Sequence, residues 1–168
     1  AGVYQKLDKN LLPNIVELDP VVVHWMRNVD KNLTYSLPYF WGTVGIVYNR
    51  DVLEKVFPKG FEQNLDLLFN PNNLKKLSKY GVSLLEESVD VIPFSLMYIN
   101  KNPNSTLPED LDLAAKHLMK MRPYIRRFTS SRVVNDIVLG DTAIALVWSG
   151  EAQQAITEAK EQGKNIEY

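Results

Sequence analysis

The sequence lacks cysteine altogether and has only two histidines among its 168 residues. Without cysteine there is no disulfide, no thiol nucleophile and no thiolate metal site. The formal net charge of −1 at pH 7 removes any overall attraction to nucleic acid or to anionic membranes, so recognition by charge has to be local. No apolar run approaches the roughly 20 residues that span a bilayer, and no signal peptide is recognisable.

What the chain does contain is enough apolar sequence for a packed core. Hydrophobic residues make up 45% and charged residues 23%, which is typical of a globular domain. The length suits one domain, and we expect residues 1–168 to form a single lobe. The opening residues, Ala1 to Tyr4, resemble the interior of a longer protein, so we expect a fragment.

Helical and extended patterns alternate along the chain. Helix signals include Asp19-Pro20 at a helix start, an apolar face from Leu111 to Met121, and alanines spaced helically up to Gly163. We further expect helices at 52–56 (capped by Asp51), 65–69, 74–77, 86–98 and 129–140, and strands at 35–48 (with a bend), 81–85, 124–128 and 142–148. The alternation predicts an α/β fold with a mixed, mostly parallel sheet flanked by helices.

Motifs for common catalytic chemistry are absent or incomplete. Gly42 and Gly45 form neither a dinucleotide fingerprint nor a phosphate loop. His24 and His117 have no partner at metal-ligand spacing, and we expect His117 to be an ordinary, partly exposed histidine. Ser149-Gly150 follows a strand, but the first glycine of a nucleophile elbow is replaced by Val147. We therefore expect no metal, no cofactor and no enzyme activity.

Acidic residues follow the predicted strand at 81–85. Glu87 and Asp90 are three residues apart, so they share a helix face at the carboxyl end of a strand, where open α/β sheets bind ligands. Acids in a first helical turn also complement the helix dipole, and composition alone favours that structural interpretation. A pair of hydrolase carboxylates is a third interpretation without further support.

Trp148 stands at the end of the strand predicted at 142–148. An indole face can cover an alkyl chain and attract a cation, although a core role is the simpler interpretation for a lone tryptophan. Carboxylates and an indole at two strand ends are together what a cationic aliphatic amine requires.

Three segments resemble periplasmic polyamine-binding proteins, the spermidine/putrescine type that serves an ABC importer. Tyr35 to Asn49 (YSLPYFWGTVGIVYN) is the most specific, and Gly140 to Gly150 (GDTAIALVWSG) is similar to the family's strand-Trp segment. Leu67 to Leu85 resembles its helix leading into a buried strand, although Leu65 stands where the family usually has Trp. The resemblance covers the whole chain.

The resemblance implies one lobe, the second, of a two-lobed Venus-flytrap fold, the type II periplasmic-binding-protein fold, with the first lobe absent. It implies that the polyamine ammonium groups bind Glu87 and Asp90, whose order is exchanged relative to the family, and that Trp148 stacks on the alkyl chain. Ser130, Ser131 and Trp41 are weaker candidates, and Trp41 is more simply structural. It also implies a periplasmic or lipid-anchored protein that docks on an ABC permease, with no nucleic-acid partner.

Two other functions stay open at this point. The same fold can bind an amino acid, a sugar or iron, although iron binders typically use tyrosines and this chain has no adjacent tyrosine pair at a strand end. An α/β enzyme is a further alternative, which the scarcity of histidine and cysteine opposes.

Overall fold

A computed structural model describes residues 2–168, which divide into two compact units at Gly42. The first unit contains α1 (Pro20–Met26) and the 3-10 turns η1 (Lys9–Leu11) and η2 (Pro13–Glu17). Asp19 caps α1 by accepting from the backbone N–H of Val21 at 2.8 Å, as the Asp-Pro pair predicts. Among the described residues of this unit only Leu33 is buried, so the segment has almost no core of its own.

The second unit, residues 43–168, holds the sheet. Its strands are β1 (Val44–Asn49), β2 (Val82–Leu84), β3 (Arg127–Phe128), β4 (Ile144–Trp148) and β5 (Ile166–Glu167). Its helices are α2 (Arg50–Val56), α3 (Asp66–Phe69), α4 (Pro71–Leu77), α5 (Ser88–Tyr98), α6 (Pro108–Met121), α7 (Val133–Leu139) and α8 (Ser149–Glu161), with 3-10 turns η3 (Ser78–Tyr80) and η4 (Arg122–Tyr124). The α/β part of the expected lobe therefore occupies residues 43–168.

The strand order is β3-β2-β4-β1-β5. β2 pairs in parallel with both β3 and β4, while β1 is antiparallel to β4 and to β5. Four of the five strands therefore share one direction and β1 runs against them, which confirms the predicted mixed sheet. The chain enters the sheet through this reversed strand, so the start of β1 lies beside the end of β4, with Val44 opposite Trp148.

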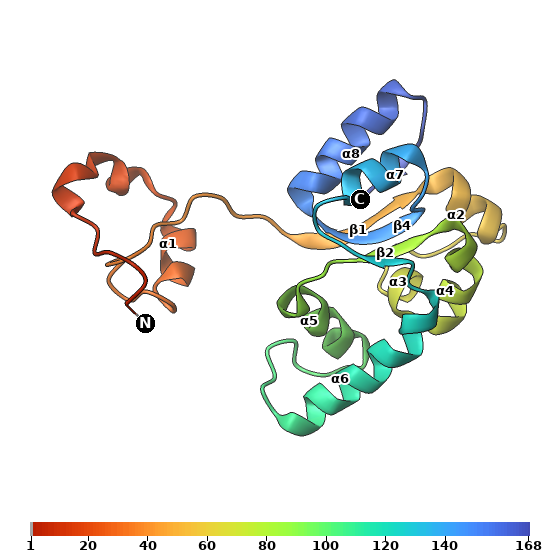
Figure 1. The fold of residues 1–168 in the computed structure, drawn as a ribbon, viewed down its shortest axis with the longest axis horizontal. Helices are drawn as coiled ribbons and strands as arrows, with labels where there is room; N and C mark the ends of the chain where they lie inside the picture. Colours follow the sequence, from red (N-terminus) through yellow and green to blue (C-terminus); the bar gives the residue numbers. More distant parts are fainter. Residues whose placement is uncertain (1) are drawn as a thin grey trace. The chain divides into compact units, whose positions relative to one another are not determined.

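Helices cover both faces of the sheet (Figure 1). Side chains alternate along β4: Ile144 and Leu146 join the core under α2 to α6, whereas Ala145 and Val147 join the core under α7 and α8. That alternation is the two-residue period of a strand, and every residue from 144 to 147 is fully buried. The apolar run at 142–148 is thus a central strand with a core on each side.

Two local predictions are wrong. The predicted strand-bend-strand at 35–48 contains only β1, because Tyr39, Phe40 and Trp41 are exposed and have no neighbouring strand to realise their β-propensity. The cap of α2 is Asn49 and not Asp51: the Asn49 side chain accepts from the Val52 N–H at 3.1 Å, which starts the helix at Arg50.

Candidate functional site

Three parallel strands end at the same edge of the sheet. Glu87 follows β2, Ser130 follows β3, and Trp148 is the last residue of β4. The register, with Ser83 level with both Arg127 and Ala145, aligns these ends. Ligands of open α/β sheets bind at such carboxyl ends, and the structure brings the predicted residues of β2, β3 and β4 to this one edge.

Glu87 is fixed by a neighbour from the adjacent strand. The Ser130 hydroxyl donates to its Oε2 at 2.5 Å. Glu87 itself occupies the N-cap position of α5 with extended backbone angles, and its main-chain carbonyl starts the helix. One carboxylate oxygen is thus oriented by Ser130 and the carboxylate is held at the strand end.

Sequence reasoning missed Glu151, the third residue of α8, which begins directly after β4. Burial raises the pKa of its carboxyl, the backbone N–H of Trp148 opposes that shift, and the negative charge of Glu87 raises the pKa further. Its Oε2 is buried and has no hydrogen-bond partner. An unpartnered, buried carboxylate oxygen beside a second carboxylate is costly for the protein alone.

A signal for Glu151 was present in the sequence. A Glu three positions after an N-cap residue can accept from that residue's own N–H, and Glu151 stands three positions after Trp148, which occupies the N-cap position of α8. The Trp148 N–H thus engages the Glu151 carboxylate at the start of the helix, while Oε2 is left without a partner. The proximity to Glu87 depends on the parallel pairing of β2 with β4, which local patterns do not reveal.

The other predicted residues lie as follows. Trp148 is 42% exposed at this edge, so its ring is not simply core. Asp90 lies in the first turn of α5 and is half-buried, and Ser131 is exposed next to Ser130. Trp41 is 69% exposed and belongs to the first unit. The roles of Glu87, Asp90, Trp148, Ser130, Ser131 and Trp41 in binding stay predictions.

The prediction for His117 is wrong, because this residue is buried between α5, α6 and α3. Its Nδ1 shares a 2.9 Å hydrogen bond with the Ser95 hydroxyl, and its Nε2 lies 2.9 Å from the Phe69 carbonyl oxygen. Its ring stacks on Tyr98 with centroids 4.9 Å apart. Desolvation lowers its pKa. Within residues 2–168 no group of three or more acidic or histidine side chains is arranged to hold a metal ion.

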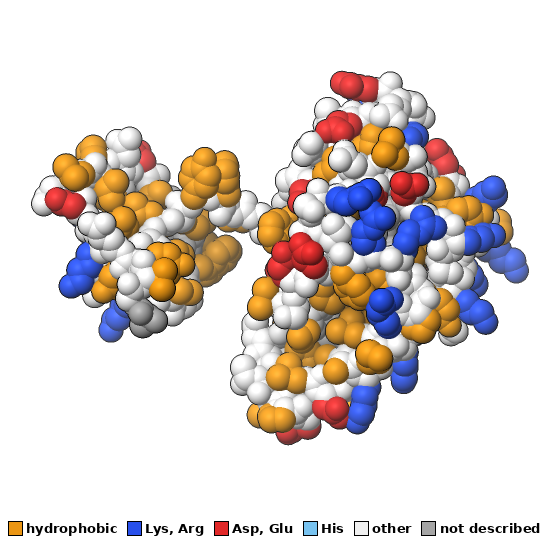
Figure 2. Space-filling view, viewed as in Figure 1, with side chains coloured by type: hydrophobic (Ala, Val, Ile, Leu, Met, Phe, Trp, Pro, Cys, Tyr) orange, Lys and Arg blue, Asp and Glu red, His pale blue; other side chains and the backbone are white. Residues whose placement is uncertain are grey.

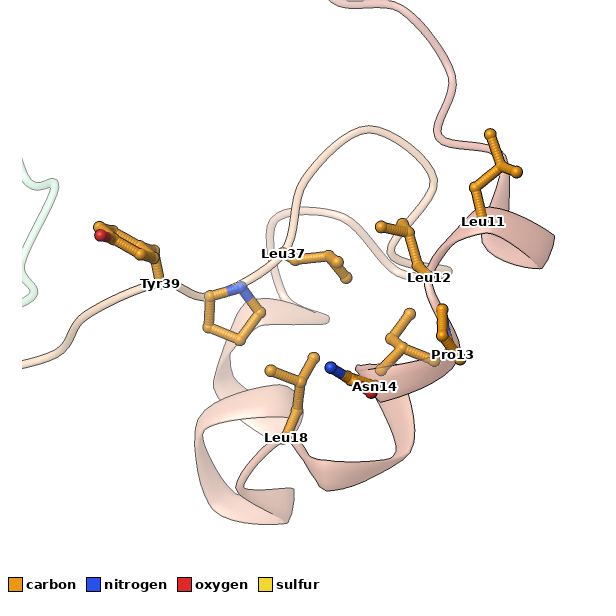
Figure 3. Close-up of a pocket in the computed structure, with 9 residues that line it drawn as sticks. Leu11, Leu12, Pro13, Asn14, Leu18, Leu37 and Tyr39 are labelled. Carbon is orange, nitrogen blue, oxygen red and sulfur yellow. The ribbon is translucent and has the colours of Figure 1, made fainter.

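Each of the two units also contains an apolar cavity. In the first unit a cavity of about 450 Å³ is lined by leucines, prolines, Asn14 and Tyr39 (Figure 3). In the second unit a cavity of about 430 Å³ lies among Ile46, Leu65, Phe94 and Tyr168. Neither lining contains a carboxylate, so neither offers the charge that an ammonium group needs.

Comparison with known proteins defines the class. The family described as bacterial extracellular solute-binding protein matches residues 1–167, and this chain belongs to it. An extracytoplasmic location follows from membership of this family. Within the described residues no helix is long and apolar enough to cross a membrane.

Individual relatives carry a more specific description. The chain is 39% identical over 172 residues to the putrescine-binding periplasmic protein PotF of Escherichia coli, covering 100% of this chain and 46% of that protein. It is 37% identical over 167 residues to the putrescine-binding periplasmic protein SpuD of Pseudomonas aeruginosa, covering 99% and 46%. The chain therefore spans about half the length of these relatives.

A solved structure shows the same fold. The spermidine/putrescine ABC transporter substrate-binding protein PotD of Streptococcus pneumoniae superposes with a TM-score of 0.73 at 24% identity, covering 98% of this chain and 46% of that one. Together with the mixed sheet and its two helical layers, this confirms the predicted type of α/β fold.

Proposed function

We propose that this chain is part of the solute-binding component of an ABC importer and binds a polyamine, putrescine or spermidine, at the carboxyl edge of β2, β3 and β4. Glu87 and Glu151 neutralise an ammonium group, Asp90 adds negative charge at the start of α5, and the Trp148 ring covers methylene groups. The binding of putrescine by the named relatives supports the choice of solute.

The observation that carries the proposal is the pair formed by Glu87 and Glu151. One oxygen of Glu151 is buried without a partner, and repulsion from Glu87 adds to the burial that raises its pKa. An ammonium ion has three donors and one positive charge, so it satisfies the free oxygen and removes the repulsion together. A neutral sugar supplies donors but no charge, and an anionic solute would increase the repulsion.

The site on this chain is one wall of the binding cleft in our proposal. The relatives are about twice as long, and we propose that a first lobe, supplied by the same protein, closes over the edge. Closure removes water from the ion pairs and strengthens them. The closed form docks on the permease, and we propose no catalytic step.

Calorimetry of the full-length protein with putrescine and spermidine tests the function. We expect one-to-one binding, weakened about 10- to 100-fold by Glu87→Gln or by Glu151→Gln, because each removes one charged partner of a hydrogen-bonded ion pair. Trp148→Ala should weaken the binding of spermidine, because the indole ring no longer packs on its methylene groups.

Glu109→Gln is the matched control. Glu109 also lies in a first helical turn, that of α6, but it is exposed and belongs to another part of the fold. Unchanged affinity in both the Glu87→Gln and the Glu151→Gln variant would contradict the proposed location of the binding site. Binding of an amino acid or a sugar in place of polyamines would contradict the proposed identity of the solute.

A further inference from the structure

Two groups of charged side chains, of opposite sign, lie on different parts of the second unit. The acidic residues of the candidate site follow the carboxyl ends of β2 and β4. Figure 2 shows acidic side chains together beside the start of α5, and Lys and Arg side chains over the side that carries α2 and α4. This second group is not used by the proposed solute site.

Five cations form this group, which we call the basic surface: Lys55, Lys76, Lys79, Arg122 and Arg126. They come from α2, α4, η3, η4 and the residue before β3, and all five are exposed. Within the described part of the chain none of the five forms an ion pair, whereas other cations such as Arg50 and Lys101 do. The basic surface therefore keeps its positive charge uncompensated by contacts within the protein.

Contacts through the protein connect three of these cations. Lys55 and Lys79 both lie over the Tyr80 ring, at 6.0 and 4.9 Å from its centroid. The Arg126 guanidinium donates to the main-chain carbonyl of Lys79 at 3.2 Å. Arg126 also donates to the carbonyl of Asp141, a contact with its backbone and not with its carboxylate. Cations distant in sequence are thus gathered on one side.

Aromatic rings lie among these cations. Lys76 lies 5.2 Å from the centroid of the Phe57 ring, and the Arg122 guanidinium lies 5.4 Å from that of Phe128, which is 42% exposed. Basic side chains mixed with aromatic rings suit an interface between water and lipid, because the cations meet headgroups while the rings enter the interfacial layer.

Two of these cations, Lys79 and Arg126, lie at the opposite end of β2 from the solute carboxylates. Arg126 donates its backbone N–H to the carbonyl of Val82, the first residue of β2, at 2.9 Å. Glu87 follows the last residue of the same strand. If the protein rests on an anionic surface through Lys79 and Arg126, the carboxylates of the solute site are held away from that surface. This orientation is favourable because the surface attracts the cations and repels the carboxylates.

We propose that the basic surface binds the anionic phospholipid headgroups of a membrane. Five cations spread over five segments exceed what a single small anion can neutralise, and they match an extended array of negative charge. Each cation close to an anionic bilayer adds roughly fivefold to binding, an effect that salt weakens.

Vesicle sedimentation of the purified protein tests the proposal. We expect binding to phosphatidylcholine vesicles that contain about 30% phosphatidylglycerol, none to pure phosphatidylcholine, and release as salt is raised. Lys76→Glu with Lys79→Glu should lower the partition coefficient by at least about 20-fold, at about fivefold for each cation removed. Lys6→Glu with Lys160→Glu is the matched control, since both residues are exposed and the change in net charge is equal.

Circular dichroism and melting temperature show whether each variant is folded, and the milder pair Lys76→Gln with Lys79→Gln replaces any that is not. Equal binding to both kinds of vesicle, or an equal loss in the control pair, overturns the proposal. Binding to soluble polyglutamate without binding to vesicles overturns it in favour of an acidic protein surface. The result does not depend on polyamine binding, so the two proposals fail separately.

Discussion

Glu151 on α8 lies near Glu87 at the start of α5, and after burial the charge of Glu87 is the second influence that raises the pKa of the Glu151 carboxyl. The two residues come from different elements and are brought to the same edge of the sheet because β2 and β4 are parallel neighbours. Two acids that repel one another reduce the stability of the empty protein, which is common where a charged ligand is to be bound.

Replacing Glu151 by Gln should therefore stabilise the empty protein. A carboxyl whose pKa is raised by folding keeps its proton longer in the folded state, so the free energy of unfolding falls as pH rises from the ordinary carboxyl range through the raised pKa. Glu151→Gln removes that fall and should raise the melting temperature at pH 7 by about 1–3 °C. Thermal melts of both proteins between about pH 4.5 and pH 7.5 measure this difference in melting temperature.

The Glu109→Gln variant is the control for these melts and should keep the pH dependence of the unaltered protein. A lower melting temperature for Glu151→Gln at pH 7 would show that its helix-capping role outweighs the repulsion.

His117 should make stability fall on the acidic side of neutrality. Desolvation, with a smaller contribution from Lys120, lowers its pKa, so the folded state favours the neutral ring. The unfolded chain then binds a proton first as pH falls below about 6.5, and the free energy of unfolding decreases from there down to the folded-state pKa. Urea denaturation at a series of pH values measures this decrease.

His117→Gln should reduce that pH dependence, even though it also lowers stability at pH 7. His24→Gln should leave it unchanged, because His24 is exposed on α1. If the free energy of unfolding depends on pH equally in the His117 variant and in the unaltered protein, His117 is not the cause of the loss of stability at acidic pH.

Gly81 and Gly140 provide a matched pair of glycines. Both have φ near +90°, but a Cβ on Gly81 would lie 2.0 Å from the Asp141 carbonyl oxygen, whereas a Cβ on Gly140 meets nothing within 4 Å. Gly81→Ala should cost more than about 3 kcal/mol, because backbone strain and a clash with main chain combine. Gly140→Ala should cost only about 1–2 kcal/mol. Similar midpoints of urea denaturation for the two variants would contradict the predicted clash between a Cβ at position 81 and the Asp141 carbonyl oxygen.

The cap of α2 can be tested with two alanine variants. Asn49→Ala should cost about 1 kcal/mol, since its side chain accepts the N–H of Val52, while Asp51→Ala should cost less than about 0.5 kcal/mol. Denaturation midpoints compare the two. A larger loss for Asp51→Ala would restore the cap predicted from the sequence.

Elements with a strong periodic pattern were predictable from the sequence. The helix expected along Leu111 to Met121 is α6, and the apolar run at 142–148 contains β4. Each buries its own side chains in a regular repeat, so a local pattern is sufficient. The exposed aromatics Tyr39 and Phe40 misled the prediction, because β-propensity describes a side chain's fit to a sheet and does not supply a neighbouring strand.

The candidate site was predictable only in part. Glu87 and Trp148 stand directly after recognisable strands, so their position at a sheet edge followed from the fold class. Glu151 could not be placed near Glu87 without the strand order, and the hydrogen bond from Ser130 depends on β3 lying next to β2. Burial of His117 depends on contacts with two other helices, which its place on α6 alone does not indicate.

The two outer strands of the sheet, β3 and β5, have two residues each, while the long strands β1 and β4 lie inside. An exposed strand edge is a template on which another chain can add a strand, and a short edge offers few free backbone groups for that purpose. The most apolar sequence of the chain, along β4, is thereby shielded on both sides by paired strands. The order of the strands consequently keeps β4 away from the sheet edges, where another chain could pair with it and begin edge-to-edge aggregation.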